Sequence, residues 1–151
     1  MPPAPVGANV VFRSTSGGAT WSPPIDTDGR DGWLGVQGDA ALPMFQKEYG
    51  EIVGLEAPDG SVLALVRPAK APTMWSSRSD TGGISWRPLT RGVFPMYALG
   101  SAALTTESGV MLVGGRFPSL AIQASWDNGH TWNMYVIDSC DTAQGTMMEV
   151  R

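Results

Sequence analysis

The segment Ser125-Trp-Asp-Asn-Gly-His-Thr-Trp132 recurs along the chain in the same frame. The two further copies are Ser14-Thr-Ser-Gly-Gly-Ala-Thr-Trp21 and Ser79-Asp-Thr-Gly-Gly-Ile-Ser-Trp86. The shared frame is Ser-x-Asp-x-Gly-x-Thr-Trp, and we refer to the three copies as the first, second and third box. The first box carries Ser16 in place of Asp, and the second carries Thr81 there and Ser85 in place of Thr. A frame that recurs along a chain indicates a repeat architecture.

The repeat extends upstream of the second and third boxes. A turn signal, Asp59-Gly60 or Ser108-Gly109, is followed seven residues after its glycine by an arginine, Arg67 or Arg116. The tryptophans that end these two boxes lie 46 residues apart. A period of about 40–50 residues with four short strands per unit is typical of the blades of a β-propeller.

Strand-like segments divide each unit into four. We expect strands at 51–56, 61–67, 73–78 and 87–90 in one unit, and at 100–105, 110–116, 120–125 and 133–138 in the next. The boxes then form the turns between strands three and four, and the Gly-containing signals form the hairpins between strands one and two. No helix of useful length is expected.

The whole chain, 1–151, is therefore interpreted as one segment of an all-β propeller. Residues 14–21 end one blade, 51–90 form a second and 100–138 form a third, and 144–151 supply the first strand of a further blade. An open set of blades leaves strand edges unpaired. We therefore expect either a fragment of a longer protein, or a chain that needs missing blades or another copy to close the propeller.

The box residues have a structural explanation. Glycine at the fifth position permits positive φ, and Asp at the third position accepts backbone N–H bonds across the turn. The Thr or Ser hydroxyl adds a second hydrogen bond that holds the turn, and Trp fills the space between strands. The structural box residues are Ser14, Gly18, Thr20, Trp21, Ser79, Gly83, Ser85, Trp86, Ser125, Asp127, Gly129, Thr131 and Trp132. Where a hydroxyl replaces the carboxylate, we expect the turn to be held less firmly, because charge-assisted bonds are the stronger kind.

Composition excludes several classes of function. The net charge of −4, with no Lys/Arg run, disfavours nucleic-acid and anionic-membrane partners. A single Cys and a single His argue against a zinc site, so no metal and no cofactor is expected. No apolar run reaches the roughly 18–20 residues of a membrane span. No signal peptide is visible, which leaves the compartment open.

The three boxes and their upstream hairpins resemble the sialidase (neuraminidase) superfamily with BNR, or Asp-box, repeats. The resemblance rests on EIVGLEAPDGSVLALVRP, MWSSRSDTGGISWRP and MLVGGRFPSLAIQASWDNGHTW, and covers about 51–138, with the first box extending it back to 14. It implies a six-bladed propeller, of which this chain supplies about three blades. It also implies an active site on one face, where arginines hold the carboxylate of an acidic sugar.

Strand direction places Arg67 and Arg116 at the end of the sheets opposite the boxes. Glu51 begins a first strand at that same end, and Tyr97 lies near the start of the next. These four residues are the candidate substrate-binding set. The alternative is that the two arginines and Glu51 lie in solvent at the ends of their strands and bind no substrate. A guanidinium suits the carboxylate of a sugar because it pairs with it through two hydrogen bonds.

The catalytic residues are not identified from the sequence. The resemblance implies a Tyr nucleophile from late blades, a Glu base and an Asp on an early loop. The candidates for that Asp are the residues of the long first connection, Asp26, Asp28, Asp31 and Asp39. The alternative is that they only belong to a polar surface loop. The expected function is that of a sialidase-like exo-glycoside hydrolase acting on acidic sugars, or a fragment of one that is inactive alone. A non-catalytic propeller that binds glycan or protein, with Trp33 or Trp75 stacking on sugar rings, is the alternative; a lyase on the same scaffold also remains open.

Overall fold

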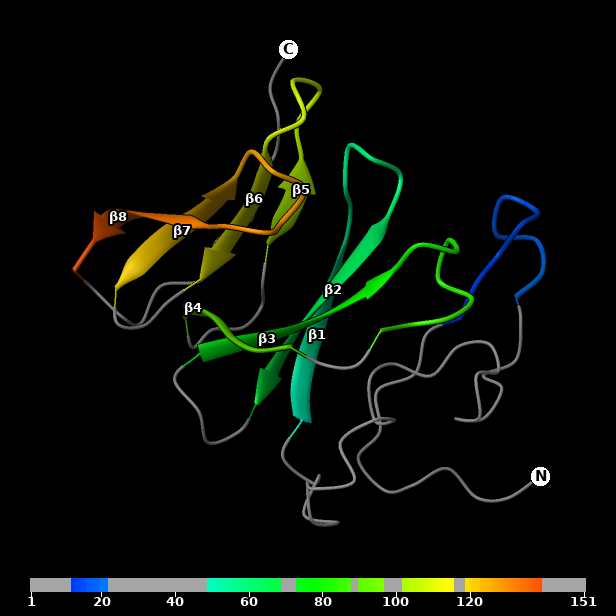
Figure 1. The fold of residues 1–151 in the computed structure, drawn as a ribbon, viewed down its shortest axis with the longest axis horizontal. Coiled ribbons are helices and arrows are strands. Elements are labelled where there is room, and N and C mark those ends of the chain that lie inside the picture. Colours follow the sequence, from blue (N-terminus) through cyan, green and yellow to red (C-terminus); the bar gives the residue numbers. More distant parts are fainter. Residues whose placement is uncertain are drawn as a thin grey trace.

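The computed structural model describes residues 12–21, 49–68, 73–87, 90–96, 102–115 and 119–139, with the backbone alone for 49–51 and 68. Two antiparallel four-stranded sheets make up most of this part, each with its strands in sequence order (Figure 1). The first sheet contains β1 (Tyr49–Glu56), β2 (Val62–Pro68), β3 (Thr73–Ser79) and β4 (Thr90–Pro95). The second sheet contains β5 (Ala103–Thr105), β6 (Met111–Gly115), β7 (Leu120–Ser125) and β8 (Asn133–Asp138). The expected all-β class is confirmed, and the described residues include no helix.

The fourth strand of the first sheet differs from its expected position. The sequence predicted it at 87–90, whereas β4 runs from Thr90 to Pro95. Arg87 does donate its N–H to the carbonyl of Arg78, but Pro88 has no N–H with which to continue a ladder. In the described residues, β4 pairs with β3 from Thr90, which lies opposite Ser76.

The two expected hairpins are present between strands one and two of each sheet. Gly60 and Gly109 have φ of +82° and +84°, in the left-handed region that glycine adopts without strain. In the first hairpin, Gly60 donates to the carbonyl of Ala57 and Ala57 donates to that of Ser61, both at 2.8 Å. This pair of bonds is that of a three-residue loop closed by a glycine bulge.

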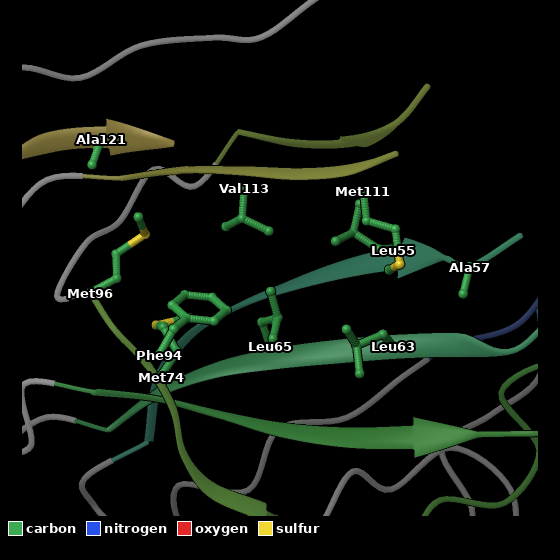
Figure 2. Packing of buried hydrophobic residues seen from close by; sticks show 10 residues of the cluster. All are labelled: Leu55, Ala57, Leu63, Leu65, Met74, Phe94, Met96, Met111, Val113 and Ala121. Carbon is green, nitrogen blue, oxygen red and sulfur yellow. The ribbon is translucent and has the colours of Figure 1, made fainter. Parts of the chain in front are cut away.

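The core lies between the facing sides of the two sheets (Figure 2). Leu63, Leu65 and Met74 of the first sheet point toward Met111 and Val113 of the second, and all five are almost fully buried. The strands β1 and β5 are in contact, and Thr105 donates its hydroxyl to the carbonyl of Glu56 at 2.6 Å. The first strands of the two sheets therefore lie next to each other, with the sheets stacked face to face.

Alternation of side chains gives each sheet two distinct faces. Met111 and Val113 face the first sheet, so Leu112 between them faces away from it, together with its partner Leu104 on β5. These two leucines are half-buried rather than buried. The far face of the second sheet thus carries apolar side chains that the described residues cover only in part.

Candidate functional site: two ends of the sheets

The three boxes fold into turns with matching hydrogen bonds, and the second and third join strands three and four of their sheets. In each box the hydroxyl of the first Ser accepts the N–H of the Gly at position five. The N···O distances are 2.8 Å for Gly18 to Ser14, 2.8 Å for Gly83 to Ser79 and 2.9 Å for Gly129 to Ser125. Ser79 and Ser125 are fully buried, so each hydroxyl supplies a partner to a backbone N–H that water does not reach. This role of the first Ser was not foreseen from the sequence.

Position three of each box accepts the N–H of position seven, as predicted. The distances are 2.8 Å for Thr20 to Ser16, 2.9 Å for Ser85 to Thr81 and 2.8 Å for Thr131 to Asp127. A second bond joins the side chains of the same two positions, at 2.8, 2.9 and 2.6 Å respectively. A hydroxyl therefore replaces the carboxylate without any change in the path of the turn.

Asp127 is the one carboxylate at position three, and its environment favours the charged form. The hydroxyl and the N–H of Thr131 hold the pKa of Asp127 down to about 2, against an ordinary 3.8, and Ser125 adds a further hydrogen bond. A carboxylate that accepts several hydrogen bonds is stabilised in its ionised form. Asp127 therefore acts as a structural acceptor in its turn, as the sequence predicted.

Positive φ occurs at both central positions of every box turn. The angles are 64° and 90° at Gly17 and Gly18, 62° and 85° at Gly82 and Gly83, and 58° and 81° at Asn128 and Gly129. Two successive positive φ angles are typical of the type I′ turn, which favours Asn-Gly. Only the second of these two positions was identified from the sequence.

The box tryptophans differ in how far they are buried. Trp132 packs against Phe94 of the first sheet, with ring centroids 5.0 Å apart, and its indole N–H donates to the carbonyl of Gly129 at 3.1 Å. Trp86 makes the matching bond to Gly83 at 3.2 Å. Trp21 instead is 61% exposed. The expectation that Trp fills space between neighbouring strands is met at Trp132 and not at Trp21.

An arginine immediately before a box reaches the next box along the chain. Arg78, which precedes Ser79, donates to the carbonyl of Asn128 in the third box and to the hydroxyl of Ser61. Arg13 precedes Ser14 in the same way, and its guanidinium lies near Gly82 of the second box, 3.8 Å from where a Cβ would be. Arginines at the same position of the repeat therefore both reach the next box along the chain, which the repeated frame did not reveal.

The other end of the first sheet carries Arg67, as strand direction predicted. Val62 at the start of β2 lies opposite Ser79 of the second box, whereas Val66 lies opposite Trp75. Arg67 follows Val66 and is half-buried, on the same side of β2 as Leu63 and Leu65. Its guanidinium is thus on the face that packs against the second sheet, at the end away from the box.

The partners proposed for Arg67 lie partly outside the described residues. Glu51 is placed by its backbone at the same end of the sheet, since Tyr49 of β1 lies opposite Pro68. Arg116 and Tyr97 fall outside the described residues, as do Trp33, the four loop aspartates and the segment 144–151. Strand β6 ends at Gly115, opposite Ala121 and away from the third box.

A second group of basic residues gathers on the box side of the first sheet. A cavity of 260 Å³ is lined by Arg78, Arg87, Arg91 and His130, together with Ser76, Thr90 and the backbone of Gly92 and Gly129. Sequence reasoning missed this cavity, because its arginines come from different elements and were not part of the repeated frame. The one available signal was the pair of arginines, four positions apart, in Ser-Trp-Arg-Pro-Leu-Thr-Arg.

Neither a metal site nor a membrane-spanning helix is found in the described part of the chain. No three His, Cys, Asp or Glu side chains there lie close enough together to hold a metal ion. No helix in that part has the length and apolar character needed to cross a membrane. No protein family, curated protein or solved structure gives a match to this chain.

Proposed function

We propose that the two sheets are consecutive blades of a sialidase-like β-propeller that acts on acidic sugars. Three observations support the propeller interpretation: sequential four-stranded sheets, contact between β1 and β5, and face-to-face packing with a common core. The same geometry is expected of neighbouring blades, whose first strands line a central axis.

The arginines that precede the boxes support the same interpretation. Arg13 approaches the second box and Arg78 binds the third, so a side chain at the same position of the repeat reaches the next unit in both cases. A closed ring needs this relation to continue. Leu104 and Leu112 on the far face of the second sheet are half-buried, and we infer that further blades, or another copy of the chain, cover them.

The observation that carries the function is the position of Arg67. Arg67 follows Val66 at the end of β2 away from the second box, and alternation puts its side chain on the face of the first sheet that packs against the second. In a propeller the two ends differ, and a ligand binds where loops from several blades converge. We propose that Arg67 pairs with the carboxylate of an acidic sugar, together with Arg116, while Glu51 orients the guanidinium and Tyr97 contacts the sugar.

Hydrolysis and binding without turnover are the two candidates at this end. Two-step glycoside hydrolysis needs a nucleophile and an acid/base group close together. Asp59 and Asp127 are engaged in turns and Asp80 pairs with Arg87, at the opposite end of the sheets from Arg67. These engaged carboxylates favour binding for the described residues, whereas hydrolysis depends on Glu51, Tyr97 and the loop aspartates.

The test separates sugar binding from hydrolysis. N-acetylneuraminate is added to the chain and followed by saturation-transfer NMR, and release of the fluorophore from a sialoside is measured in parallel. Arg67→Met retains the apolar stem and removes the charge, so binding should weaken about tenfold. Arg67→Lys retains the charge but lacks the planar guanidinium. Its affinity for N-acetylneuraminate should therefore lie between those of the parent chain and Arg67→Met.

The matched control is Ser108→Ala, in an exposed hairpin turn, which should bind like the parent chain. The proposal fails if N-acetylneuraminate does not bind, or if Arg67→Met binds it as well as the parent while retaining the same unfolding midpoint. If the parent chain releases the fluorophore and Arg67→Met does not, the result favours hydrolysis over binding alone.

A further inference from the structure

Strand β8 forms the outer edge of the second sheet. It pairs with β7 on one side, and no other strand of the described residues pairs with its outer side. All six of its residues are exposed, and the exposed fractions of Met134, Tyr135, Val136 and Ile137 run from 42% to 60%. An edge strand presents backbone N–H and C=O groups that its own sheet does not use, and an apolar edge is therefore a template for another strand.

The matching edge of the first sheet, β4, has a different composition. It contains Arg91 and Pro95, a charge and a residue without an N–H. Both are devices that keep an edge strand from pairing with another chain. The segment Asn133–Asp138 contains no Lys, Arg or Pro. The two edges occupy the same place in their sheets, so the apolar character of β8 is a property of that strand and not of the repeat.

A further sheet stacked on the second would not cover the middle of β8. Thr90 lies opposite Ser76 in the first sheet, and Tyr135 lies opposite the equivalent residue, 46 positions further along the chain, in the second. Thr90 and Arg91 thus correspond to Tyr135 and Val136. Both residues of the first sheet remain exposed although the second sheet packs on it. The apolar side chains of β8 therefore fit a partner at the edge of the sheet rather than one stacked on its face.

An exposed aromatic pair lies beside this edge. Trp126, at the second position of the third box, is 57% exposed, and its ring meets that of Tyr135 edge-on, with centroids 6.4 Å apart and planes at 71°. The contact restricts both rings before a partner binds, so less side-chain freedom is lost on binding. Tyr, Trp and Met are enriched at protein–protein interfaces, and Met134 lies next to this pair in the chain.

Symmetry and charge favour a second copy of the chain as the partner. In an antiparallel pairing about a two-fold axis, a pairing centred on Tyr135 sets this residue opposite itself and Met134 opposite Val136 of the other copy. The ladder with β7 is regular over these three residues, and its one extra residue, Ile137, lies beyond them. The charged residue of the strand, Asp138, then lies at opposite ends of the interface in the two copies, so like charges do not face each other.

We propose that β8 pairs antiparallel with β8 of a second copy, so that the two second sheets become one continuous sheet across a two-fold axis. Backbone groups on the outer side of β8 supply the hydrogen bonds, and Trp126, Met134, Tyr135 and Val136 supply the apolar contact. This edge is separated from β5 by β6 and β7. The proposal therefore does not depend on the function proposed for Arg67.

The test is the oligomeric state of the full chain, measured by sedimentation velocity over a series of protein concentrations. We expect the parent chain to form a reversible dimer. Tyr135→Lys places two ammonium groups beside the two-fold axis and should weaken the dimer at least about tenfold, because like charges then face each other. Thr90→Lys, the same substitution at the equivalent position of the first sheet, is the matched control and should dimerise like the parent chain.

Two further measurements locate the interface. Tyr135→Thr gives β8 the residue that the first sheet carries at this position, and it should weaken the dimer without adding a charge. Amide hydrogen exchange should slow at alternate residues of β8 as the protein concentration rises, because only every second residue directs its N–H toward the partner. Exchange in β4 should not depend on concentration.

The proposal is overturned if the parent chain stays monomeric up to its solubility limit. A monomer in which the amides of β8 are protected at every concentration would show that another segment of the same chain covers the edge, and this result also contradicts the proposal. A third contrary result is a dimer that Tyr135→Lys and Tyr135→Thr leave unchanged while retaining the unfolding midpoint of the parent. If Thr90→Lys weakens the dimer as much as Tyr135→Lys does, the interface is not at β8.

Discussion

The guanidinium of Arg78 on β3 donates a hydrogen bond to the backbone carbonyl of Asn128 in the turn that follows β7. Only 8% of Arg78 is exposed, and the same side chain also donates to Ser61. One buried cation thus connects the two sheets at the end where the boxes lie. Its loss leaves a part-buried carbonyl without its charged donor, which costs more than losing an exposed contact.

Replacing Arg78 should therefore destabilise the packing of the two sheets. We expect Arg78→Met to lower the free energy of unfolding by about 2 kcal/mol, since hydrogen bonds to charged groups contribute about 1.5–3 kcal/mol. Arg87→Met, which removes an exposed ion pair, should cost less than about 1 kcal/mol. Urea unfolding followed by tryptophan fluorescence measures both. Equal losses in the two variants would contradict a linking role for Arg78.

Gly129 and Gly60 provide a matched test of crowding at the sheet interface. Their φ angles are +81° and +82°, so alanine is strained about equally at both positions. A β-carbon at Gly60 meets nothing within 4 Å, whereas one at Gly129 lies 2.7 Å from a methyl of buried Leu63. We expect Gly60→Ala to cost about 1 kcal/mol and Gly129→Ala roughly 2–4 kcal/mol.

The same unfolding titration distinguishes the two glycine variants. If Gly129→Ala costs no more than Gly60→Ala, the third box does not press against Leu63 as the structure has it. Equal m-values are needed for the comparison, because they indicate that the same surface is exposed on unfolding.

Acid should weaken the third box through Asp127. Its pKa is lowered in the folded chain to about 2 from 3.8, so its contribution is complete above about pH 4 and is lost as the pH falls toward 2. We expect Asp127→Asn to be less stable than the parent by about 1 kcal/mol at pH 7, the carboxylate being partly solvated. The difference between the two proteins should shrink between pH 4 and 2.

Comparing the two proteins at each pH cancels the contribution of Asp59, whose pKa the hydroxyl and N–H of Ser61 also lower. Thermal unfolding monitored by circular dichroism from pH 7 to pH 2 gives the measurement. A stability difference that stays constant over this range would mean that the charge on Asp127 contributes nothing to the turn.

Restoring a carboxylate should strengthen the second box. Thr81 already accepts the N–H of Ser85 at 2.9 Å, and Thr81→Asp offers the same bond to an ionised acceptor. We expect a gain of about 0.5–1 kcal/mol at pH 7, reduced by repulsion from neighbouring Asp80. Thr81→Asn, similar in size but neutral, is the control in urea unfolding. If Thr81→Asp is no more stable than the parent, the hydroxyl of Thr81 holds the second box as firmly as a carboxylate would.

The strands and turns followed from the sequence because they depend on local chemistry. The repeated Ser, Gly and Trp fixed the positions of the box turns, and Gly60 and Gly109 fixed the hairpins. Strand β4 lies further along the chain than expected, and proline at position 88 has no N–H to donate to β3. That displacement depends on which N–H groups are available to β3, and the polar and apolar pattern alone does not encode it.

The contacts between the sheets were much harder to predict. In the sequence Arg78 is an ordinary polar residue of a strand. Its neighbours do not reveal that its guanidinium binds the carbonyl of Asn128, 50 residues further on. The cavity of Arg87, Arg91 and His130 has the same origin, since it forms only when two sheets stack. Arg67 was placed correctly at its end of the strand, because strand direction alone determines that end.

The interchange of Ser16, Thr81 and Asp127 at one position has a practical consequence for recognising such repeats. All three side chains accept the same N–H, so any short side chain with an acceptor oxygen serves there. A search pattern that insists on aspartate would find one turn of this chain and overlook two. A pattern that allows Ser, Thr or Asp at this position would find all three, provided that the next two residues are Gly or Asn, which tolerate positive φ.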